Sequence, residues 1–205
     1  MLPVFPLPVV VFPSEEIRLH IYEERYKQMI ADCDKKNIPF VILPFIHNQV
    51  QDRGSLMILT EIRKKYEDGR MDIIATCSQC CQLKKFYLEF PKKLYSGVEI
   101  ELNEEFSESD NASQYQELKT AFQELCSLNS VQPYHAVVWD QFVSYKIAHY
   151  VGFNLEEEYA LFCIDEESKR IEKLIDQIHH LIQQTKQRQD WIQRLNMNGE
   201  FRFFN

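Results

Sequence analysis

Glycine is scarce in this chain of 205 residues, and its spacing excludes several kinds of nucleotide-binding and hydrolytic enzyme. The five glycines are Gly54, Gly69, Gly97, Gly152 and Gly199. A Walker A phosphate loop needs two glycines five positions apart before Lys and Ser or Thr, and no pair here fits. The patterns G-x-G-x-x-G and G-x-S-x-G are excluded in the same way. The sequence therefore predicts neither ATPase nor peptidase activity.

Long apolar runs are also absent. No window approaches the roughly 18 uncharged apolar residues of a membrane span, so we expect none. Prolines interrupt the apolar N-terminal stretch and the first basic residue is Arg18, which is not the pattern of a secretory signal. Six cysteines in a chain of this length do not predict a disulfide scaffold. We therefore expect a cytoplasmic protein with reduced thiols.

Basic residues are outnumbered, with 23 Lys and Arg against 31 Asp and Glu and a net charge of -8. A protein that binds nucleic acid by neutralising phosphates is usually basic, so nucleic acid is not the expected partner. A local basic patch remains an alternative, because several cations fall in neighbouring predicted strands and turns. They are Arg63, Lys64, Lys65, Lys84, Lys85, Lys92 and Lys93. RNA binding is therefore kept as a competing function.

The first stretch of the chain combines prolines with two kinds of apolar periodicity. Four of the eight prolines stand here, at Pro3, Pro6, Pro8 and Pro13. Because proline lacks a backbone donor, we expect the first strand to meet proline only at its ends or at an edge. Residues 17–22 then alternate as a half-buried strand does. From Glu23 the spacing becomes helical, with one apolar face formed by Tyr26, Met29, Ile30 and Cys33.

The order of the remaining elements predicts an α+β fold. Apolar runs predict strands at residues 40–43, 55–62, 71–76, 82–90 and 94–102, with a hairpin turn at Asp68-Gly69. Helical spacing dominates after them, ending in one long final helix from about residue 166 to residue 195. We therefore expect a β-rich lobe over residues 1–104, an acidic linker over residues 105–113, and a helical lobe with an aromatic tail over residues 114–205. Docking of the final helix on its neighbours is favoured over a dimeric coiled coil, because its apolar stripe drifts from strict heptads.

A cysteine cluster, Cys77-x-x-Cys80-Cys81, raises the question of a zinc or redox site. Zinc takes four ligands, and no second pair accompanies this one. On a regular strand the side chains of Cys77 and Cys80 would also point to opposite faces. Ordinary buried cysteines are the better interpretation. We expect no metal and no cofactor, and no catalytic residue is nominated.

These segments resemble the N-terminal, substrate-binding domain of the Lon protease, a domain that is also found as a stand-alone protein. The resemblance rests chiefly on LPVFPLPVVVFPSEEIRLHIYEERYKQMI at Leu2–Ile30. It continues through Asp68-Gly69-Arg70, the segment LYSGVEIEL, and FNLEEEYALFCIDEESKRIEKLIDQI at Phe153–Ile178. It implies a six-stranded PUA-like pseudo-barrel followed by a helical bundle. Many relatives have a glycine near Cys77, so the local bulge is left open.

The resemblance implies a non-catalytic module that recognises unfolded or partner polypeptides. Exposed apolar surface, or main-chain hydrogen bonds at an open sheet edge, would do the binding. A homodimer is a further expectation, and a small-molecule pocket in the barrel is a third function. In the tail, Phe201, Phe203 and Phe204 either fold back on the chain or contact a partner.

Overall fold

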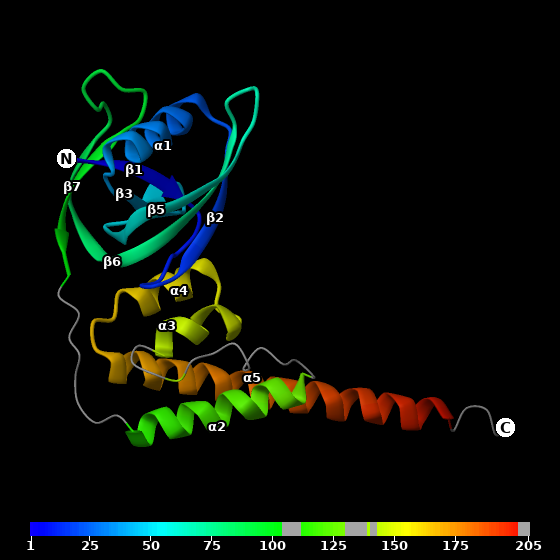
Figure 1. The fold of residues 1–205 in the computed structure, drawn as a ribbon. Coiled ribbons are helices and arrows are strands. Elements are labelled where there is room, and N and C mark those ends of the chain that lie inside the picture. Colours follow the sequence, from blue (N-terminus) through cyan, green and yellow to red (C-terminus); the bar gives the residue numbers. More distant parts are fainter. Residues whose placement is uncertain (104–111, 130–138, 140–142, 201–205) are drawn as a thin grey trace. The chain divides into compact units, whose positions relative to one another are not determined.

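The computed structural model describes residues 1–103, 112–129, 139 and 143–200, and it divides into two compact units that we describe separately (Figure 1). One unit comprises Met1–Glu105 with Asn154–Cys163, and the other comprises Phe106–Phe153 with Ile164–Asn205. Most of the predicted linker, residues 105–111, lies outside the described residues. The tail residues Phe201, Phe203 and Phe204 lie outside them as well, so their role stays a prediction.

The first unit is built on a sheet that closes on itself. Its strands are β1 (Leu2–Leu7), β2 (Glu16–Ile21), β3 (Phe40–Ile46), β4 (Gln49–Val50), β5 (Arg53–Lys65), β6 (Met71–Tyr87) and β7 (Gly97–Leu102). The strand order is β1-β7-β6-β5-β3-β4, and β1 also pairs in parallel with β3. This extra pairing closes a ring of five strands, while β2 pairs with the first part of β6 (Figure 1). The α+β fold predicted from the order of the elements is confirmed, and the sheet closes into a barrel as the family resemblance implied, with seven described strands where six were expected.

The structure corrects the expectation for the prolines of β1, because Pro3 and Pro6 lie inside the strand. The N–H of Val4 donates to Ser96 O at 3.2 Å, so the nitrogen of Pro6, two residues later, also points to the β7 side. Only Leu2 and Pro3 of β1 pair with β7, so no residue of β7 lies opposite Pro6 to accept a hydrogen bond from its nitrogen. Pro3 in turn precedes the ladder with β3, which begins at Val4. Both prolines occupy positions where a missing N–H leaves no partner unsatisfied.

One long strand, β6, replaces the two separate strands predicted for this segment. It pairs on one side with β5, and on the other side first with β2 and then with β7. The hairpin predicted at Asp68-Gly69 joins β5 to β6, and Gly69 has the positive φ of 80° that the turn requires. The bulge left open at Cys77 is present without a glycine, since the register with β5 shifts between Gln79 and Cys77.

Helix α1 (Glu24–Lys36) covers the barrel with the face predicted for it. Its buried residues are Tyr26, Met29, Ile30 and Cys33, and all four belong to the larger apolar core of the unit. The helix ends at Asn37, which has left-handed backbone angles and whose N–H donates to Cys33 O. The chain then passes through Pro39 into β3.

A short helix, α4 (Leu155–Phe162), also belongs to the first unit, although chain order alone had assigned it to the helical lobe. It begins with the reciprocal cap of Asn154 and Glu157. The hydroxyl of Tyr159 donates to Asp52 Oδ1 at 2.7 Å and accepts from the backbone N–H of Arg53 at 3.2 Å. These contacts hold α4 beside the start of β5.

The second unit contains α2 (Ala112–Leu128), α3 (Val143–Ile147), the short 3-10 helix η2 (Ala148–Tyr150) and the long helix α5 (Glu167–Glu200). Helices α2 and α5 run parallel, because Gln114 contacts Glu172 and, further along, Glu124 contacts Lys186. A buried ion pair between Arg170 and Glu167 ties the start of α5 to Ser144 of α3. No helix among the described residues is long and apolar enough to cross a membrane.

A glycine in β5 sets how closely β3 can approach this strand, and its substitution tests the barrel. A Cβ atom at Gly54 would lie 2.4 Å from Ile42 O and 2.5 Å from Leu43 Cδ2. We expect Gly54→Ala to lower the free energy of unfolding by about 1–3 kcal/mol, because the two strands must separate. Urea unfolding at neutral pH measures the change, with the exposed Gln49→Ala as a control expected to stay within about 0.5 kcal/mol. Unchanged stability of Gly54→Ala would contradict this packing.

Candidate functional site

The ladder between β3 and β5 is much shorter than β5 itself. It pairs Phe40, the first residue of β3, with Met57, and it continues only toward the start of β5. Two residues before Phe40 prevent a longer ladder. Asn37 has left-handed backbone angles at the end of α1, and Pro39 has no backbone N–H to donate. On the other side, β5 pairs with β6 as far as Lys65. Within the described part of the chain, residues 58–65 of β5 therefore have no strand partner on the side away from β6, and we call this side the open edge.

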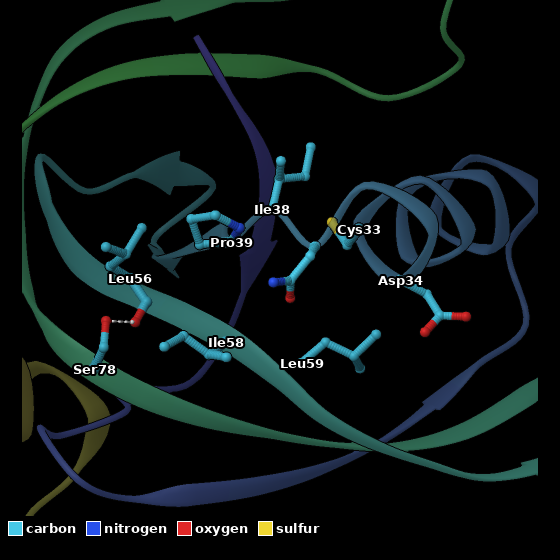
Figure 2. A pocket seen from close by; sticks show the side chains of 9 residues that line it. Cys33, Asp34, Ile38, Pro39, Leu56, Ile58, Leu59 and Ser78 are labelled. Carbon is cyan, nitrogen blue, oxygen red and sulfur yellow. Dashed lines mark hydrogen bonds between the residues drawn. The ribbon is translucent and has the colours of Figure 1, made fainter.

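A pocket lies where the ladder ends, between the C-terminal end of α1 and β5 (Figure 2). We call it the β5 edge pocket, and it is a cavity of about 290 Å³. Its lining residues are Cys33, Asp34, Asn37, Ile38, Pro39, Leu56, Ile58, Leu59 and Ser78. Most of these side chains are apolar, and Asp34, Asn37 and Ser78 add a few polar groups. Ser78 Oγ already donates to Leu56 O at 3.0 Å, as Figure 2 shows.

The open edge is apolar near the pocket and charged further along. Ile58 is 50% exposed although it is a large aliphatic residue, whereas Leu59 packs partly against the core. Natural sheet edges are usually protected by charged residues, above all lysine. Here the charged residues of the open edge begin at Glu61, and its three cations, Arg63, Lys64 and Lys65, lie at the end of β5. The part of the edge next to the pocket therefore carries no charged side chain between Ile58 and Thr60.

An ion pair fixes the wall of the pocket that α1 provides. Lys93 Nζ lies 2.6 Å from Asp32 Oδ2, and the hydroxyl of Tyr95 donates to the same oxygen at 2.8 Å. Burial acts to raise the pKa of Asp32, but the hydrogen bonds from Lys93 and Tyr95 outweigh burial and hold it below its ordinary value. The neighbouring thiol of Cys33, which lines the pocket, has its pKa raised to about 12 by burial. It is therefore protonated at neutral pH and is a poor nucleophile.

A sequence model of the ATP-dependent protease La (LON) substrate-binding domain matches residues 1–180 of the chain. The chain belongs to this family. Two solved Lon domains share its fold. The Lon N-terminal domain protein from Xanthomonas campestris has a TM-score of 0.68 at 17% identity, over 85% of this chain and 96% of that one. The N-terminal domain of the Mycobacterium avium complex Lon protease has a TM-score of 0.66 at 13% identity, over 87% and 97%. No curated protein matched the chain.

In this Lon substrate-binding domain the predicted cysteine cluster lies in the core. Cys77, Cys80 and Cys81 are all buried, and Cys77 and Cys81 pack in different apolar clusters. Burial raises the pKa of both of these thiols, that of Cys81 to about 12. Among the described residues, no three His, Cys, Asp or Glu side chains are arranged to hold a metal ion.

The cations considered for RNA binding do not gather into one patch on this Lon domain. Arg63, Lys64 and Lys65 lie at the end of β5 that pairs with Met71, the first residue of β6. Lys84 lies 13 residues further along β6, roughly 40 Å at the usual rise per strand residue. Lys84 is also ion-paired with Glu101, and Lys93 with Asp32. The cations of β5 and those near the end of β6 therefore lie in separate parts of the sheet.

The ion pair that holds α1 predicts a pH-dependent stability. Because the pKa of Asp32 is lower in the folded state, its stabilising effect is present above the unfolded value of about 3.9 and is lost as the pH falls through the folded value. We expect Asp32→Asn to lower the unfolding free energy by about 1–3 kcal/mol at pH 7. The difference from the wild type should shrink below about pH 4, as measured by urea unfolding across this range.

The control for this experiment is Asp34→Asn, at an exposed carboxylate that lies 3.8 Å from Lys65 Nζ. Its effect at pH 7 should stay within about 1 kcal/mol, as for other exposed pairs. A pH-independent difference between the wild type and Asp32→Asn would show that Asp32 acts through packing and not through its charge.

Proposed function

We propose that the chain is a non-catalytic polypeptide-binding protein and that extended segments of unfolded or partner polypeptides bind at the open edge of β5. One observation carries the proposal: a substrate-binding domain has an unpaired strand edge that runs directly into a pocket lined largely by apolar side chains. Strand addition of this kind draws affinity from main-chain hydrogen bonds, and adjoining pockets select the side chains. Such a site suits a protein that must bind many different sequences.

The polar clusters of the first unit support a binding role over a catalytic one. Two described pairs join a histidine to a carboxylate, as a catalytic dyad does: His20 with Asp72 at 2.6 Å and the exposed pair His47 with Glu156 at 2.7 Å. Asp72 also accepts a hydrogen bond from the hydroxyl of Tyr66 at 2.7 Å, so its carboxylate links β2, β6 and the hairpin that follows β5. The contact of His20 with Asp72 is an exposed cross-strand contact on the sheet. The thiols in the barrel are buried, where burial keeps Cys33, Cys77 and Cys81 protonated.

The competing functions fit the described residues less well. RNA binding would need cations that act together, and those of β5 and of the far end of β6 are separated along the strand. A small ligand would need several converging polar groups, whereas six of the nine residues that line the β5 edge pocket have apolar side chains. The predicted homodimer stays a prediction, and the exposed side chains of Trp191, Ile192 and Leu195 on α5 are surface that such a contact would cover. A cytoplasmic location likewise stays a prediction, supported by six cysteines that form no disulfide.

A charge placed on the open edge tests the proposal. We expect Ile58→Glu to weaken binding of a fluorescein-labelled, reduced and carboxymethylated model polypeptide at least tenfold, because the new carboxylate would be desolvated on binding. The fold should survive, since Ile58 is 50% exposed. Leu102→Glu is the matched control, because Leu102 is 48% exposed on β7 and lies outside the site. Fluorescence anisotropy titration measures both variants, and the control should stay within twofold of the wild type.

Two results would contradict the proposal. The first is a wild-type protein without saturable binding at micromolar concentrations. The second is an equal loss of binding in Ile58→Glu and Leu102→Glu. Circular dichroism of each variant separates a loss of binding from a loss of folding.

A further inference from the structure

Resting on the proposed function, we infer that the open edge of β5 selects acidic polypeptide segments, in which carboxylates precede the apolar residue that fills the β5 edge pocket. The chain as a whole would repel such segments, since its net charge is -8. The end of β5 has the opposite sign. Between Glu61 and Lys65 it carries one carboxylate and three cations, at Arg63, Lys64 and Lys65.

Arg63 and Lys65 are exposed and only loosely ion-paired, whereas Lys64 Nζ lies 4.4 Å from the centre of the Tyr66 ring. Arg63 Nε lies 3.5 Å from Glu61, Lys65 Nζ lies 3.8 Å from Asp34, and the two cationic side chains are 52% and 62% exposed. Elsewhere in the same unit the ion pairs are tight, for example 2.6 Å between Lys93 and Asp32. Loose pairs leave the cations able to bind a carboxylate from a partner with little loss of existing contacts.

The geometry of the edge fixes the order of residues in the bound segment. A strand that continues the antiparallel direction of β3 would begin opposite Lys65 and end opposite Ile58, next to Pro39. Side chains directly opposite each other on paired strands lie about 5 Å apart, within reach of an ion pair. Carboxylates near the start of the segment would therefore meet Arg63 and Lys65. An apolar side chain near its end would meet Ile58 and the pocket.

A second explanation of the same cations makes the opposite prediction. Lysine and arginine on a sheet edge can simply prevent pairing with other chains. If that were their main effect here, neutralising them would strengthen the binding of every extended segment, whatever its charge. Selection of acidic segments instead requires that neutralisation weakens the binding of acidic segments alone.

The test uses three labelled peptides with one shared apolar sequence, preceded by two Glu, two Gln or two Lys residues. In anisotropy titrations at low salt, we expect the wild-type chain to bind the Glu peptide about three- to tenfold more tightly than the Gln peptide, and the Lys peptide most weakly. The double variant Arg63→Gln with Lys65→Gln should lose this preference and still bind the Gln peptide. Lys84→Gln with Lys85→Gln, on β6, is the control and should keep the preference. Added salt should reduce it as well.

The outcomes separate this inference from the proposed function. Equal binding of all three peptides that is still lost in Ile58→Glu would overturn the selection of acidic segments and leave polypeptide binding intact. Tighter binding of every peptide by the Arg63 and Lys65 double variant would also overturn it, in favour of edge protection. If none of the peptides binds the wild-type chain, both the inference and the proposed function fail.

Discussion

Phe40 is the first residue of β3 that pairs with β5, and the properties of the site follow from that limit. Residues before Phe40 cannot lengthen the ladder with β5. Pro39 has no backbone N–H to donate, and Asn37, with left-handed backbone angles, is the C-terminal cap of α1. Strand β5 nevertheless continues to Lys65, since β6 supports it from the other side. One short strand beside one long strand leaves an open edge, and the end of α1 next to that edge makes a pocket.

The ring of five strands is otherwise closed, and the remaining unpaired strand sides of the described first unit belong to the short strands β2 and β4, which each pair with one neighbour. Strand β1 pairs with both β7 and β3 and closes the ring, and β2 covers the first part of β6. A closed barrel normally gives no template for another chain. The open edge therefore offers main-chain hydrogen bonds in a stable frame, with α1 held in place by Asp32 and Lys93.

Local sequence signals predicted much of the fold. Helical spacing predicted the buried face of α1, and Asp68-Gly69 predicted the hairpin between β5 and β6. The failures were non-local. Prolines can lie within β1 because of which neighbouring strand pairs with each of its residues. Strand β6 is continuous because β5 pairs with it along most of its length. A short helix such as α4 gives no local signal of the unit on which it packs.

The candidate site was predicted even less well, because it is a difference in length between two paired strands. The sequence showed a proline before Phe40 and an apolar run after Gly54. It did not show that these segments pair with each other, or where their pairing stops. The cations of β5 were visible, but they were grouped with those of β6 that the fold places far along the strand. The end of the β3–β5 ladder and the separation of these cations both depend on which residues pair between strands, and the periodicity of a sequence does not predict this pairing.

Amide hydrogen exchange of the 205-residue chain, with and without a saturating concentration of an acidic peptide, tests whether a bound segment pairs with the open edge. The account predicts slower exchange for the amides of β5 between Ile58 and Lys65 that point away from β6, because they would donate to the added strand. Amides of β5 that already donate to β6 should change little. Saturating binding that leaves the exchange of residues 58–65 unchanged, and slows exchange elsewhere, would contradict the account.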